Sequence, residues 1–146
     1  MLNKKAGVTL PEVVDEVDEG FGTELFIGGP VQKESLHFIH RHHNLTDTDN
    51  EIADDLFWAG NFDTLLDKIN TRQVRGSDLK FFLGYSGWSP GQLLDELEQK
   101  SWIVCKGVDT SLIFDTPVND MWREVLKRMG GKYKVIAGYP LDPRLN

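Results

Sequence analysis

The 146 residues of this chain, 40% of them hydrophobic, suffice for one domain with its own core, and we expect a single domain over residues 1–146. The net charge of −7 argues against direct binding to nucleic acid, because Lys and Arg must neutralise the phosphates. The single cysteine excludes an intrachain disulfide, and no apolar run approaches the roughly 20 residues of a membrane span. No signal peptide opens the chain, so we expect a cytoplasmic protein that does not bind membranes.

The first half of the chain alternates short elements with turns. The expected elements are, in order, a helix over residues 9–20, strands over residues 24–31 and 35–43, an acidic loop over residues 44–55, a strand up to Gly60 and a helix over residues 61–69. Thr9 and Glu12 form a capping box for the first helix, and Asn61 caps the second. Gly28, Gly29 and Pro30 force a turn at the end of the first strand.

The second half begins with the apolar strand of "FFLGYSGWSPGQLLDEL", which leads through a glycine-serine turn into a helix. Ser89 is the expected N-cap, Pro90 the first helical residue and Gln92 the third position of a capping box. The residues expected to pack on this helix are Leu93, Leu94 and Leu97. Strands over residues 101–107 and 111–114 and a helix over residues 116–131 complete the chain. Strands alternating with helices predict an α/β sandwich with a mixed β-sheet.

The last predicted helix has a distinct pattern of apolar and basic residues. Its apolar face consists of Met121, Trp122, Val125, Leu126 and Met129. The basic residues of this end of the chain are Arg123, Lys127, Arg128, Lys132 and Lys134. They form either a solvated outer face or a surface for an acidic partner.

The turn "GYSGW" is a near match to the G-x-S-x-G elbow that presents a nucleophilic serine in hydrolases. Gly84 and Ser86 fit the pattern, but Trp88 stands where a small residue is needed. The base is missing too, because all four histidines precede residue 44 and hydrolases of this class place theirs after the serine. We therefore expect no catalytic residue at this turn.

The same turn is also a candidate ligand site, since Gly84, Ser86 and Gly87 precede a helix that could hold an anion. Pro90 offers no N–H there, however, and no phosphate-binding glycine motif is present. The turn is thus mainly architectural. If a ligand binds, we expect it at the two glycine turns, on Gly28, Gly29, Pro30, Gly84, Ser86, Gly87, Trp88 and Gln92.

Four histidines cluster in "HFIHRHH". On a strand, His40 and His42 would share one face, a spacing that can chelate zinc or nickel, while His37 and His43 would point to the other face. Four ligands then do not converge, so whether these histidines bind metal stays open. We expect no metal and no cofactor.

Two further candidates are rejected. The acidic loop "DTDNEIADD" lacks the sixth-position glycine of a calcium loop and has Trp58 where a glutamate is required. Cys105 lies in the apolar run "WIVC", which is typical of a buried small hydrophobe rather than a reactive thiol.

Taken together, "IGGPV", "LHFIH", "FWAGNFDTLL", "FFLGYSGWSPGQLLDEL" and the closing "DPRLN" resemble the YqgE/AlgH family of bacterial proteins. The motifs occur in the family's order over most of the chain. The resemblance implies an α/β fold with a mixed sheet, a cytoplasmic location and no established enzymatic activity. One branch of the family carries the label of putative transcriptional regulator.

The chain departs from the family pattern at its start. Members usually open with a strand, a helical segment and a second strand ending in a motif like "GFVLNKP", and here Met1–Lys4 stand at the end of that opening. Lys5 replaces the usual proline. We expect the family's first core elements to be absent, which would open a sheet edge. Because an open edge pairs readily with another chain, we expect self-association, most simply a two-fold homodimer.

Three functions are compatible with these observations. The first is a non-enzymatic binding or regulatory protein, with a protein or small-molecule partner at the Gly28–Val31 and Gly84–Gln92 turns. The second is a small-molecule or anion-binding enzyme at those turns. The third, a transcriptional regulator, is the least favoured because no basic recognition helix is evident. A deep pocket with convergent polar groups beside Ser86 would favour the second, and an exposed apolar surface the first.

Overall fold

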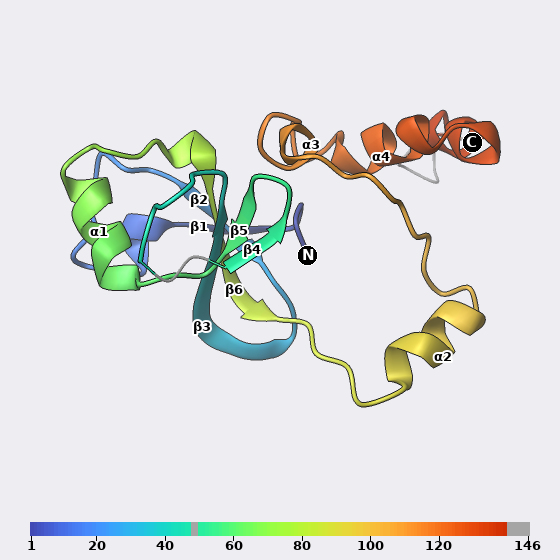
Figure 1. Ribbon diagram of the computed structural model, residues 1–146, viewed down its shortest axis with the longest axis horizontal. Helices are drawn as coiled ribbons and strands as arrows, with labels where there is room; N and C mark the ends of the chain where they lie inside the picture. The colour runs from blue at the N-terminus through green and yellow to red at the C-terminus, as the bar shows by residue number, and fades with distance from the viewer. Residues whose placement is uncertain (48–49, 140–146) are drawn as a thin grey trace.

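The computed structural model describes residues 1–47 and 50–139 and has a mixed β-sheet with helices on both faces, as predicted (Figure 1). The strands are β1 (Lys5–Thr9), β2 (Glu24–Ile27), β3 (Val31–His40), β4 (Asn50–Ala53), β5 (Leu56–Trp58) and β6 (Leu79–Tyr85). The helices are α1 (Phe62–Asn70), α2 (Gln92–Glu98), α3 (Thr110–Phe114), α4 (Met121–Met129) and α5 (Gly131–Ala137), with 3-10 turns η1 (Leu10–Glu12) and η2 (Gly76–Asp78). The strand order is β1-β2-β6-β3-β5-β4, and only β2 and β6 run parallel among the described neighbours.

Successive residues of the central strand β6 point to opposite faces of the sheet, which gives the fold two apolar layers. Phe81 packs in a cluster with Leu10 of η1 and Leu65 of α1. Phe82 belongs to a second cluster, to which α3 contributes Ile113. The helices α1 and α3 therefore cover opposite faces of one sheet.

Helix α1 forms as the sequence predicts. The side chain of Asn61 accepts a hydrogen bond from the backbone N–H of Thr64 at 2.9 Å. Leu65 and Ile69, one turn apart, are buried against the sheet. The predicted cap is confirmed, and the helix buries one apolar face.

The helix expected over residues 9–20 is wrong apart from its first turn. The capping box between Thr9 and Glu12 is present, but only η1 follows it. Further on, the Asp18 carboxylate accepts from the backbone N–H of Gly20. Asn70 of α1 accepts from the Asp18 N–H and donates to the Glu16 carbonyl. These bonds satisfy the backbone outside a helix, which is how Asp and Asn commonly compete with helix formation.

Two boundaries in the middle of the chain also differ from the prediction. Strand β3 begins at Val31 rather than residue 35 and ends at His40 rather than residue 43. It ends there because His40 pairs with Leu79, the first residue of β6, and the partner strand extends no further. The expected acidic loop contains strand β4, which pairs with β5. Residues 48 and 49 of this loop and the "DPRLN" motif lie outside the described residues.

The strands expected over residues 101–107 and 111–114 are absent from the described structure. The first segment has no regular structure, and Trp102, Ile103 and Val104 are exposed. The second lies in helix α3 because the Asp109 side chain caps its start, accepting from the Leu112 N–H at 2.9 Å.

The helix expected over residues 116–131 is also shorter, and a further helix follows it. Pro117 lies before α4, which starts at Met121, and Gly130 is the C-cap of α4. Gly130 has a φ of 69° and separates α4 from α5. On the predicted apolar face, Met121 and Leu126 are buried but Trp122 is exposed.

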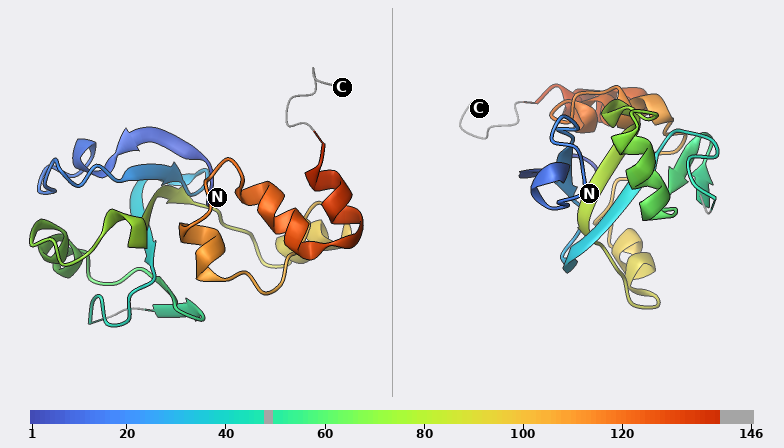
Figure 2. Two further views of the ribbon diagram at one scale, coloured as in Figure 1. Left: turned by 90° about the horizontal axis from the view of Figure 1, so that it is seen from above. Right: turned by 90° about the vertical axis from the view of Figure 1, so that its left-hand side faces the viewer.

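Residues 86–109 form an arm that leaves the sheet, carries α2 and returns to α3 (Figure 1). Figure 1 shows α2 apart from both the sheet and the α3–α5 helices, and the right-hand view of Figure 2 again shows it apart from α3–α5. The three leucines expected to be buried, Leu93, Leu94 and Leu97, are 40%, 67% and 36% exposed. The predicted helix exists, but its predicted packing is wrong. Among the described residues, no helix is both long and apolar enough to cross a membrane.

Candidate ligand site at the glycine turns

The two glycine turns singled out from the sequence lie against each other. The N–H of Gly28 donates to the Leu83 carbonyl at 2.8 Å, and the Ser86 hydroxyl donates to the Gly28 carbonyl at 3.2 Å. A β-carbon on Gly28 would overlap the carbonyl oxygen of Gly84, and one on Gly29 would overlap the backbone of Tyr85. Glycine is therefore needed here for close backbone approach.

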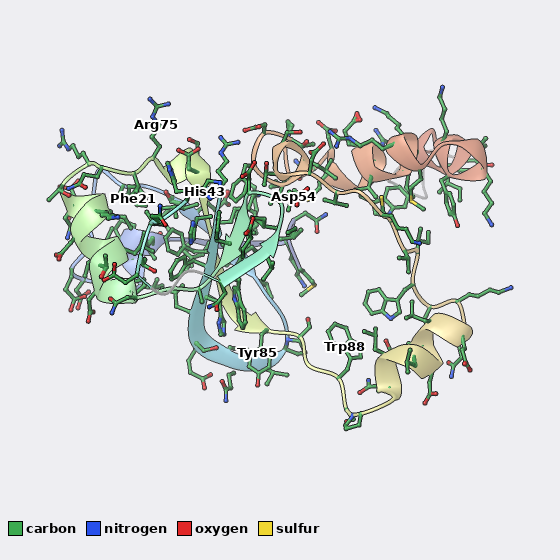
Figure 3. The ribbon with its side chains drawn as sticks, in the orientation of Figure 1. Phe21, His43, Asp54, Arg75, Tyr85 and Trp88 are labelled. Carbon is green, nitrogen blue, oxygen red and sulfur yellow. The ribbon has the colours of Figure 1, made fainter. Side chains whose placement is uncertain are left out.

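A hollow of ≈ 510 Å³ opens beside this contact, and we name it the aromatic hollow. Its lining residues are Met1, Leu2, Gly28, His37, Trp58, Phe82, Gly84, Tyr85, Ser86 and Trp88. Figure 3 shows Tyr85 at the end of β6 and Trp88 in the segment that leads to α2. The sequence prediction included four of these residues but missed the rings of His37, Trp58, Phe82 and Tyr85.

The rings of the hollow come from separate strands and stand at an angle to one another. The His37 ring lies 6.4 Å from that of Trp58 and 5.8 Å from that of Tyr85, the latter edge to face. The Ser35 hydroxyl is 3.0 Å from His37 Nε2 and holds the imidazole in place. Trp58, Tyr85 and Trp88 each remain at least 40% exposed, so their faces are accessible to a ligand.

The other predicted ligand residues lie elsewhere. Gly29 and Pro30 line a second hollow of ≈ 570 Å³, together with Lys4 and Lys33. Gly87 and Gln92 are not among the residues that line either hollow. The predicted ligand residues thus fall into three groups, one in each hollow and one in the arm. That any of these residues binds a ligand stays a prediction.

Ser86 does not have the surroundings of a nucleophile. Its hydroxyl donates to a carbonyl oxygen, and in the described part of the chain no histidine or carboxylate is hydrogen-bonded to it. Activation of a serine requires such a base within hydrogen-bond reach.

The four histidines are held by different partners because β3 ends at His40. His40 is fully buried, with its ring stacked on Phe57 at 5.2 Å and Nδ1 3.1 Å from the His42 carbonyl. His42 contacts the Asp78 carboxylate at 3.1 Å, and His43 contacts Asp55 at 2.7 Å. Among the described residues, no three His, Cys, Asp or Glu side chains gather as a metal site would require.

Gln92 and Trp88 take part in a second constellation, on the arm, that we name the Glu96 clamp. Trp88 Nε1 and Trp102 Nε1 both donate to Glu96 Oε2, at 3.2 and 2.7 Å, while Gln92 Nε2 donates to Oε1. The bonds from Trp102, Gln92 and Trp88 lower the pKa of Glu96. The clamp fastens the segments on both sides of α2 to the helix itself.

Cys105 is half-buried rather than buried, since the strand expected around it does not form. Its thiol donates to the Lys106 carbonyl at 3.6 Å. This weak local contact gives the cysteine no activating partner.

Comparison with known proteins finds relatives along the whole chain. The sequence profile described as AlgH-like matches residues 1–134. A UPF0301 protein of Cytophaga hutchinsonii is 42% identical over 147 residues, which cover 100% of this chain and 80% of that protein. A UPF0301 protein of Chlorobaculum parvum is 37% identical over 149 residues, covering 100% of this chain and 77% of that protein.

Two solved structures share the fold. The AlgH protein from Pseudomonas aeruginosa matches with a TM-score of 0.73 and 23% identity, over 97% of this chain and 76% of that one. Protein DIP2367 from Corynebacterium diphtheriae also gives a TM-score of 0.73, with 21% identity over 94% of this chain and 73% of that one. Both matches support the mixed α/β architecture.

Proposed function

The chain belongs to the AlgH-like family, and within it we propose that this protein is a non-enzymatic binding protein that holds a flat apolar group in the aromatic hollow. The observation that carries the proposal is the set of accessible rings from β3, β5 and β6 around one hollow of ≈ 510 Å³. Ligand pockets are commonly apolar hollows of about 300–1,000 Å³ with a few polar groups that fix orientation. The single cysteine supports a cytoplasmic setting.

The few polar atoms at the hollow support binding better than catalysis. Ser86 Oγ and His37 Nε2 are each engaged in a hydrogen bond, to Gly28 and Ser35. Tyr85 and Trp58 offer large rigid rings that bind flat groups at low entropic cost. A small molecule and an aromatic side chain of a protein partner present the same chemistry to this surface.

Indole is a suitable probe for the proposal, because it has the size and flatness of the expected group. We expect saturable binding of indole in ligand-observed NMR, and Trp58→Ala to weaken it about fivefold or more, since stacking on one ring is worth about 1–3 kcal/mol. Trp122→Ala is the matched control, because Trp122 is 43% exposed, close to the 47% of Trp58, but lies on α4 outside the hollow.

Equal binding by both variants, or no saturable binding of indole by the unmodified protein, would contradict the proposed site. Far-UV circular dichroism of Trp58→Ala verifies that β5 and its neighbours remain folded. A second probe, cyclohexanol, tests the preference for flat rings: we expect it to bind more weakly than indole.

A further inference from the structure

Helix α2 presents an apolar face that the described part of its own chain leaves uncovered. Leu93, Leu94 and Leu97 are spaced as one face of a helix and all three are exposed. Monomeric proteins rarely leave such a contiguous apolar surface unless it meets a partner. The Glu96 clamp joins α2 to the segments before and after it. The exposed apolar face therefore belongs to a helix whose two ends are both fixed by hydrogen bonds.

The same helix is acidic, and two of its carboxylates have no ion-pair partner among the described residues. Asp95, Glu96 and Glu98 are three acids without a base in residues 92–98. Glu96 is held in the clamp, whereas Asp95 and Glu98 form no ion pair with the described residues. A partner for this helix should therefore combine an apolar surface with positive charge.

The helices α4 and α5 have that combination. Val135 of α5 is 64% exposed, and Tyr139, two residues beyond the end of that helix, is 58% exposed. Lys132 and Lys134 precede Val135 in α5, and neither forms an ion pair among the described residues. In total, residues 121–137 hold five basic residues and one acid. The two surfaces match in both apolar character and charge.

Within one chain, α2 and α4–α5 lie apart from each other, both on the side of the molecule away from α1 (Figures 1 and 2). We infer that α2 of one copy docks on α4–α5 of a second copy, and that the second copy returns the same contact. A two-fold arrangement makes both contacts at once and closes the assembly. This interface differs from the sheet edge expected from the sequence, and it does not use the aromatic hollow.

Charge reversal in two variants tests the inference. The first variant carries Asp95→Lys with Glu98→Lys, and the second carries Lys132→Glu with Lys134→Glu. Each variant alone would place like charges across both contacts, so we expect its dimer dissociation constant to rise about tenfold or more relative to the unmodified protein. Sedimentation velocity over a wide concentration range measures both constants.

An equal mixture of the two variants is the decisive sample. Both contacts of the mixed pair again join opposite charges, so we expect a heterodimer, identified by its mass in native mass spectrometry. An unmodified protein that stays monomeric would overturn the inference, and so would folded variants that self-associate normally or a mixture that forms no heterodimer. Circular dichroism establishes that each variant is folded. Leu94→Ala, which changes no charge, should independently weaken the dimer of the unmodified sequence.

Discussion

Gly28 shows how strongly a single backbone position constrains the site. The α-hydrogen that a side chain would replace faces the carbonyl oxygen of Gly84, so any side chain would push β2 and the end of β6 apart. We expect Gly28→Ala to lower the free energy of unfolding by roughly 2–3 kcal/mol, because the obstacle is backbone that has no free direction to move. Chemical denaturation measures the change.

Gly87→Ala is the control in the facing turn, Gly84–Gln92. A β-carbon there would lie 3.5 Å from the Tyr85 ring, an ordinary contact, and we expect a change within about 0.5 kcal/mol. Equal losses for Gly28→Ala and Gly87→Ala would mean that the two turns do not meet as described.

At the residue scale, the sequence identified the glycines of the site but not its rings. Gly28 and Gly84 are recognisable because turns at strand ends require glycine. His37, Trp58 and Tyr85 come from three strands, and they meet only through the pairing of β3 with β5 and β6. Such a juxtaposition depends on strand order and register, which local patterns do not specify.

At the scale of elements, the N-cap of α2 is not Ser89, the residue predicted from the sequence, and the difference can be tested. Gly91, at a φ of 84°, occupies the N-cap position, whereas Ser89 accepts no capping bond through its side chain. The backbone N–H of Ser89 donates to Gln92 Oε1 at 3.0 Å, so Gln92 reaches back to Ser89 as predicted although the serine side chain makes no capping bond. We expect Gln92→Ala to speed amide hydrogen exchange in α2 several-fold, since one hydrogen bond contributes about 0.5–1.5 kcal/mol. Ser89→Ala, the matched control, should leave exchange unchanged, and protection lost in Ser89→Ala would restore the predicted cap.

Elements were predictable where local signals agreed with tertiary packing. In α1, the Asn61 cap and the apolar spacing of Leu65 and Ile69 both indicate one buried helix. Residues 111–114, "SLIF", are too few for periodicity to separate helix from strand. The sequence signal for a helix here was Asp109, a residue type that commonly caps helices. In the structure, bonds from Ser111, the Leu112 N–H and Arg128 lower the pKa of the Asp109 carboxyl to about 2.

At the scale of the whole molecule, the sequence predicted the sheet and its covering helices but not the arm. An apolar stripe such as that of Leu93, Leu94 and Leu97 indicates that a helix face is covered, without indicating what covers it. Within the described chain nothing does. The three leucines predicted to be buried are exposed, and this exposure is the observation from which we infer contact with a second copy.

The connection between the sheet and α3 depends on Arg41, which follows the last residue of β3. Its guanidinium contacts Asp78 of η2 at 2.7 Å and Asp115, just after α3, also at 2.7 Å. Asp78 is the more buried acid, with 14% of its side chain exposed against 54% for Asp115. Burial alone would raise the pKa of Asp78, but the bonds from Arg41 and His42 outweigh it and the pKa is lowered.

We therefore expect Asp78→Asn to lower the free energy of unfolding by about 1–2 kcal/mol at neutral pH, since hydrogen bonds to charged groups are among the stronger ones. A carboxyl whose pKa is lowered by folding stabilises the protein above its unfolded pKa, about 3.9, and loses that contribution as the pH falls through the folded value. The difference in the free energy of unfolding between the unmodified protein and Asp78→Asn should thus disappear below about pH 4.

Asp55→Asn, which alters the exposed pair with His43, is the control and should change stability little at any pH. Denaturation curves over this pH range measure both variants, and a constant gap would show that the Asp78 carboxylate does not provide the connection.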